Sequence, residues 1–121
     1  MVTWNNLDTL TSFNELSKTE RVNLAEVMSG ENGAERVKNY SIPMAEGFTY
    51  NYAAKSVDDK VLAALAKLAE EAQLAEKFEA LYNGEVINTG EKRLVLHHMT
   101  RGQLGDAVEA DGVDKRTFYT E

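Results

Sequence analysis

The sequence predicts a mainly α-helical α+β fold with a short β-hairpin and small turns. Apolar residues recur at helical spacing in several stretches, which indicates amphipathic helices. Two short runs of aromatic and β-branched residues interrupt them, and Asn-Gly and Asp-Gly pairs mark turns. The chain has 121 residues, 43% of them apolar, which is enough for a single small domain with a core.

Composition and charge exclude several classes of protein. The formal net charge is -7, and the basic residues alternate with acidic ones, so a nucleic-acid-binding surface is not expected. No run of 18 apolar residues could span a membrane, and the first residues do not resemble a secretion signal. The chain has no cysteine, which excludes disulfides and thiolate zinc sites. We therefore expect a cytoplasmic protein without nucleic-acid or membrane partners.

The first third of the chain predicts two helices. Apolar spacing indicates a helix over residues 4–17, with Thr3 as its cap, and a second over residues 20–28, with Thr19 as its cap. Ser29 and Gly30 are expected to end the second helix.

The middle of the chain predicts a hairpin followed by the clearest helix. Residues 37–42 and 48–52 favour two short strands, broken near Pro43. Ser56 can then cap a helix, with Asp59 completing a near capping box. We expect that helix to break near Gln73, because the apolar pattern restarts at Leu74, Phe78 and Leu81.

Periodicity does not decide between strand and helix for residues 93–99. The segment follows a turn at Asn83-Gly84. Thr89 lies where a helix cap would lie, and Glu91 suits a first helical turn, so a helix is favoured. Its candidate core residues are Val95, Leu96 and Met99.

The last stretch predicts a turn and a short helix. Asp111-Gly112 should form a turn between short extended pieces over residues 108–113, and Asp114 should cap a helix that begins at Lys115. That helix has only about two turns before the last residue, which a natural chain end would leave marginal. We expect a cut at this place.

Candidate chemistry is sparse. His97 and His98 are adjacent and would diverge on either a helix or a strand, so a shared metal is disfavoured; we expect His97 to pack inward and His98 to face solvent or a neighbour. The run Glu109-x-Asp111-Gly112 lacks the first and last ligands of a calcium loop. The acidic pairs 58–59 and 70–71 favour solvated surface over acid–base catalysis.

Arg93 and Arg101 could together bind a phosphate. They lie eight positions apart, about two helical turns, and would share one side of a helix. The competing interpretation, which we favour, is that Arg93 anchors this helix through backbone carbonyls or a buried carboxylate.

The stretch from residue 78 to residue 101 resembles the glucose-6-phosphate isomerase (phosphoglucose isomerase) family, whose run reads approximately G-E-x-I-N-x-T-E-x-R-A-V-L-H-x-A-L-R. The matching positions are Gly84, Glu85, Ile87, Asn88, Glu91, Arg93, Val95, Leu96, His97 and Arg101. The departures are Gly90, Leu94, His98-Met99-Thr100 and Gly102-Gln103-Leu104-Gly105, which indicate a divergent branch.

The resemblance implies an N-terminal helical segment of a two-domain αβα sandwich (SIS-type) isomerase, cut before its first sandwich domain. Such enzymes interconvert glucose 6-phosphate and fructose 6-phosphate through a cis-enediol, in glycolysis and gluconeogenesis. A glutamate moves the proton, histidine and lysine aid ring opening, and no metal or other cofactor is needed. All these groups lie C-terminal to the matched region.

We therefore expect residues 1–121 alone to be structural and inactive, without catalytic, cofactor-binding or metal-binding residues. The expected partners are the C-terminal domains of the isomerase and, in the full-length enzyme, a second subunit. Two alternatives are an acidic helical protein-interaction module without catalysis and a small metal- or ligand-binding enzyme that uses His97 and His98.

Overall fold

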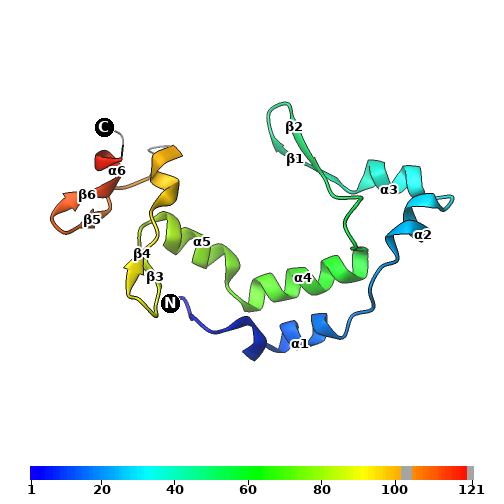
Figure 1. Ribbon diagram of the computed structural model, residues 1–121, viewed down its shortest axis with the longest axis horizontal. Helices are drawn as coiled ribbons and strands as arrows, with labels where there is room; N and C mark the ends of the chain where they lie inside the picture. The colour runs from blue at the N-terminus through cyan, green and yellow to red at the C-terminus, as the bar shows by residue number, and fades with distance from the viewer. Residues whose placement is uncertain (102–104, 120–121) are drawn as a thin grey trace. The chain divides into compact units, whose positions relative to one another are not determined.

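The computed structural model describes residues 1–101 and 105–119 (Figure 1). The chain forms two compact units: the hairpin unit, Thr11–Leu68, and the terminal unit, which combines Met1–Leu10 with Ala69–Glu121. Helices and three separate antiparallel strand pairs make up the described elements, which confirms the mainly helical α+β class. Of the divergent stretch that follows Arg101, residues 102–104 lie outside the described part.

The first helices are shorter than the sequence predicts. A 3-10 turn, η1 (Leu7–Thr9), ends at an extended Leu10, so the predicted helix over residues 4–17 is wrong in its first half and α1 covers only Thr11–Ser17. The next helix, α2 (Leu24–Ser29), is capped by Asn23, whose side chain accepts from the Glu26 amide, so the expected Thr19 cap is also wrong. Gly30 is the C-cap, as predicted.

The predicted hairpin forms with a later start. The helix α3 (Gly33–Asn39) occupies the beginning of the expected first strand, and β1 covers Ser41–Ala45. It pairs antiparallel with β2 (Phe48–Asn51) across a turn in which Gly47 has φ +71°. Pro43 lies inside β1 and does not break it, because an edge strand tolerates a residue without an amide hydrogen.

A long helical stretch follows, broken at the predicted place. The helix α4 covers Asp59–Glu71, and the carboxylate of Asp58 accepts from the Val61 amide at 2.8 Å, so Asp58 caps the helix and the expected Ser56 cap is wrong. Gln73 is left-handed, with φ 53°, and separates α4 from α5 (Leu74–Tyr82).

Residues 93–99 do not form the predicted helix. They contain the strand β4 (Arg93–Leu94), paired with β3 (Val86–Asn88), and then enter the 3-10 helix η2 (His97–Arg101). The Asn88 side chain accepts from the Glu91 amide and donates to the Glu91 carboxylate, both at 3.2 Å, and Lys92 has φ 54°. These contacts turn the chain back on itself, which competes with a helix start at Thr89.

The last elements follow the prediction. The strands β5 (Glu109–Ala110) and β6 (Val113–Asp114) pair across Asp111 and Gly112, whose φ angles of 55° and 74° fit the hairpin turn that Asp-Gly favours. Asp114 caps α6 (Lys115–Phe118) by accepting from the Arg116 amide at 3.1 Å.

The terminal unit holds most of the buried side chains. Met99 is completely buried, with Ala80, Val108 and Arg116 also buried, whereas Val95 and Leu96 are half-buried. Gly84 lies against Val108 so closely that a Cβ would overlap both Val108 methyl groups. Among the described residues, no helix is both long and apolar enough to cross a membrane.

Candidate functional site

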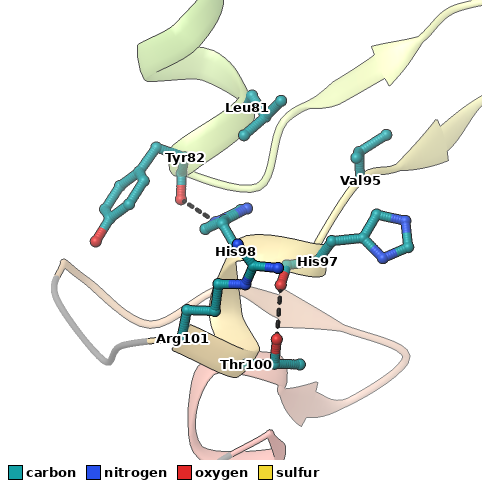
Figure 2. Close-up of a pocket in the computed structure, with 7 residues that line it drawn as sticks. All are labelled: Leu81, Tyr82, Val95, His97, His98, Thr100 and Arg101. Atoms are coloured by element: carbon teal, nitrogen blue, oxygen red, sulfur yellow. Dashed lines mark hydrogen bonds between the residues drawn. The ribbon is translucent and has the colours of Figure 1, made fainter. Parts of the chain in front are cut away.

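The candidate site is a cavity of about 690 Å³ in the terminal unit, where α5 ends and η2 begins (Figure 2). Three of the polar residues that the sequence singles out line it: His97, His98 and Arg101. The other lining residues are Leu81, Tyr82, Val95 and Thr100.

His98 is bound to the end of α5. Its Nε2 lies 3.1 Å from the Tyr82 carbonyl oxygen, and its ring stacks on the Tyr82 ring with centroids 5.0 Å apart (Figure 2). A carbonyl only accepts, so Nε2 donates and carries the proton. Nδ1 is buried and has no hydrogen-bond partner among the described residues.

The orientation of the two histidines is the reverse of the prediction. His97 is exposed, and His98 is the half-buried member that forms a hydrogen bond. The last carbonyls of a helix lack partners within the helix. His98 donates a hydrogen bond to one of these carbonyls, that of Tyr82. The two residues are 16 positions apart, so the spacing of adjacent residues could not reveal the contact.

Arg116 is the residue that sequence reasoning missed. Its side chain is 4% exposed; Nη2 donates to the Tyr82 carbonyl at 2.7 Å, Nε donates to the Asp106 carbonyl, and the guanidinium lies 5.0 Å from the centre of the Tyr82 ring. A cation suits the negative end of a helix. Because 34 positions separate Arg116 from Tyr82, no local sequence pattern could have indicated this contact.

Gly105 leaves room for this arginine. It has φ +107°, and a Cβ there would approach the Arg116 guanidinium nitrogen to 3.0 Å. The close approach and the backbone conformation both favour glycine at this position.

Arg93 and Arg101 do not share a helix face. Arg93 lies in β4, where its guanidinium is 3.9 Å from the Glu91 carboxylate, whereas Arg101 ends η2 and lines the cavity. Both partners of the Arg93–Glu91 pair are largely exposed, and such a surface pair contributes little to stability. The alternative in which both arginines share one side of a helix is therefore wrong, and the carboxylate beside Arg93 is exposed, not buried as the favoured interpretation expects.

The titratable groups with shifted pKa values have structural partners. A hydrogen bond from the Thr117 hydroxyl, followed by the amides of Val108 and Arg116, lowers the pKa of Asp114. In the hairpin unit, partial burial and a hydrogen bond to Asp59 raise the pKa of Tyr40. Across residues 1–101 and 105–119, no three His, Cys, Asp or Glu side chains gather as a metal site would require.

Comparison with known proteins identifies the family. The family model described as phosphoglucose isomerase matches residues 51–119. The chain is 51% identical over 121 residues to the glucose-6-phosphate isomerase of Treponema denticola, a match that covers 96% of this chain and 23% of that protein. The glucose-6-phosphate isomerases of Treponema pallidum (strain Nichols) and Borreliella burgdorferi (strain B31) are 42% and 36% identical, each over 98% of this chain.

The chain thus spans about a quarter of the length of the curated relatives it matches. The matched region contains β3, β4 and the cavity-lining residues of η2, the part in which the sequence resembles the family motif. The chain belongs to the phosphoglucose isomerase family.

Proposed function

We propose that this chain is the N-terminal part of a glucose-6-phosphate isomerase, the cytoplasmic enzyme that interconverts glucose 6-phosphate and fructose 6-phosphate through a cis-enediol in glycolysis and gluconeogenesis. The observation that carries the proposal is the 51% identity to the Treponema denticola enzyme along 96% of this chain. In this proposal, residues 1–121 form one segment that precedes the first αβα sandwich domain.

The segment has a structural part in the proposed enzyme. His98 and Arg116 both donate to the Tyr82 carbonyl, and Asp114 caps a helix. These polar groups therefore form hydrogen bonds that stabilise the terminal unit. The proton-transferring glutamate, the ring-opening groups and the phosphate-binding loops would come from the C-terminal domains. Those domains, and a second subunit in a homodimer, are the proposed partners.

The test compares the full-length gene product with the 121-residue chain. Both are supplied with fructose 6-phosphate, and glucose 6-phosphate formation is followed through a coupled dehydrogenase. We expect turnover by the full-length protein and none by residues 1–121. A full-length protein without turnover would contradict the proposed enzyme, and turnover by residues 1–121 would contradict the structural role.

A further inference from the structure

The β1–β2 hairpin carries an apolar face that its own unit leaves largely exposed, although Tyr40 stacks on Tyr52 at one end of it. Ile42 pairs with Tyr50 in the antiparallel register, and paired residues point to the same face of a sheet. Phe48, Tyr50 and Tyr52 follow at intervals of two, so they share this face with Ile42. We call these four residues the aromatic face.

Three members of the aromatic face are well exposed for such large apolar side chains: Ile42 is 46% exposed, Phe48 59% and Tyr50 42%. Met44, at the register irregularity of β1, adds a further side chain that is 61% exposed. Single exposed apolar residues are ordinary, but a contiguous apolar surface marks a contact with another part of a protein.

The opposite face of the hairpin has a different role. The Asn51 side chain donates to the Val37 carbonyl of α3 at 2.6 Å and accepts from the Ala53 amide at 3.1 Å. Thr49, which pairs with Pro43, is exposed on the same side as Asn51. The polar face is therefore held by its own unit, which fixes the direction in which the aromatic face is presented.

A cavity of about 370 Å³ continues the aromatic face towards the start of α4. Three hairpin residues line it, and Val57 and Leu62 extend the apolar wall; the full set is Ile42, Tyr50, Tyr52, Lys55, Val57 and Leu62. Arg36 holds this connection in place, because its guanidinium donates to the carbonyls of Lys55 and Val57 at 2.9 and 2.7 Å.

We propose that the aromatic face and this cavity are a docking surface for the C-terminal remainder of the isomerase polypeptide, packed in the same molecule. The inference rests on the proposed function. The relative with 51% identity is about four times as long as this chain, so a large body of covalently linked polypeptide is available to cover the face. A linked segment reaches an effective concentration in the millimolar range, which a second copy in solution does not match.

The energetics of the hairpin favour the same occupant. An isolated two-stranded hairpin is marginally stable in water and needs a further layer against its apolar side. Each fully buried large apolar side chain contributes about 1.5–3 kcal/mol. Covering the aromatic face would therefore stabilise both the hairpin and its attachment to the rest of the enzyme.

Thiol labelling of the full-length protein tests the proposal. Residues 1–121 have no cysteine, so Phe48→Cys and Thr49→Cys each place a reporter on one face of the hairpin, read by mass spectrometry of the hairpin peptide. Each labelling rate is divided by the rate of the same variant in denaturant. We expect the thiol from Phe48→Cys to be protected at least about tenfold more than that from Thr49→Cys, as for a site that reacts only after local opening.

Ile42→Cys reports on the same face if Phe48→Cys disturbs folding. Its thiol should show the same protection from labelling as the thiol from Phe48→Cys. Equal labelling from the two faces would overturn the docking proposal. Protection that disappears on dilution would overturn it in favour of a second copy. Isomerase turnover of the unsubstituted full-length protein is measured alongside: turnover without protection rejects the docking surface alone, and protection without turnover rejects the proposed function alone.

Discussion

The two units use the same device to hold their loops. In the hairpin unit, Arg36 donates to the carbonyls of residues 53, 55 and 57, and its guanidinium lies 4.3 Å from the centre of the Tyr40 ring. In the terminal unit, Arg116 donates to the carbonyls of residues 106 and 82 and lies over the Tyr82 ring. A planar guanidinium suits this use, because its donors point in fixed directions while its face stacks on an aromatic ring.

The difference between the two arginines is burial. Arg36 is half-buried, whereas Arg116 is 4% exposed. Water can replace the donors of a half-buried arginine more readily than those of a buried one, whose removal also leaves a space in the packing. The same hydrogen bonds should therefore contribute more to stability in the terminal unit than in the hairpin unit.

Arg116→Ala should produce the largest effect. It removes two charge-assisted hydrogen bonds, including one to the last turn of α5, and leaves a space beside Tyr82. We expect the free energy of unfolding to fall by about 3–5 kcal/mol, as for hydrogen bonds to charged groups lost from a buried site. Urea unfolding of the 121-residue chain, followed by tyrosine fluorescence and far-UV circular dichroism, measures it.

Arg116→Lys is the matched control. It keeps the charge but loses the planar fork, so it should recover only a minor part of the lost stability. Full recovery would show that the stability depends on the positive charge near the end of α5 and not on the two directed hydrogen bonds.

Gly84→Ala should come next, and Gly47→Ala is its counterpart in the other unit. Both glycines have φ near +70°, but a Cβ at Gly84 would overlap Val108, whereas nothing lies within 4 Å of a Cβ at Gly47. We expect about 2–4 kcal/mol of destabilisation at Gly84 from backbone strain plus overpacking, and about 1 kcal/mol at Gly47 from strain alone. Equal losses in urea unfolding would mean that Val108 moves aside without cost.

Arg36→Ala should have a smaller effect than Arg116→Ala. Its three carbonyl acceptors lie in a partly exposed connection, so water can take over part of their hydrogen bonding. We expect a loss of about 1–2 kcal/mol, the usual contribution of hydrogen bonds that solvent can partly replace. Hydrogen exchange of the residue 53–57 peptide should accelerate in this variant, and a loss as large as that of Arg116→Ala would contradict the comparison.

Local sequence signals predicted the elements that local contacts define. The Asp111-Gly112 turn, the Asp114 cap and the break at Gln73 all depend on neighbours within a few positions, and all are present. The predicted start of α2 differs from the observed one because Thr19 and Asn23 are both competent caps, and cap preference alone does not choose between them.

The site could not be predicted in the same way. The Thr89 cap predicts a helix over residues 93–99, whereas the structure has a turn closed by the Asn88–Glu91 hydrogen bonds. His98 and Arg116 contact Tyr82 across separations of 16 and 34 positions. No local pattern in a single sequence indicates contacts over such separations. The family resemblance identified the right region without revealing its geometry.

The smallest expected effect concerns pH, to which the two units should respond at opposite ends of the scale. The folded pKa of Asp114 lies below its ordinary value of 3.8, so its contribution to stability is present above that value and is lost as pH falls through the folded pKa. The folded pKa of Tyr40 lies above 10.0, so its contribution is present below pH 10.0 and is lost as pH rises through the folded pKa.

Asp114→Asn and Tyr40→Phe separate these two dependences. Urea unfolding should show that Asp114→Asn reduces the loss of stability below about pH 4 and leaves the stability at alkaline pH unchanged. Of Asp114 and Tyr40, only Asp114 titrates in the acid range. Tyr40→Phe should flatten the loss above about pH 10 and leave the acid side unchanged. A change in alkaline stability from Asp114→Asn, or in acid stability from Tyr40→Phe, would contradict the assignment of one pH response to each unit. The pH dependence would then arise from contacts other than Thr117–Asp114 and Tyr40–Asp59.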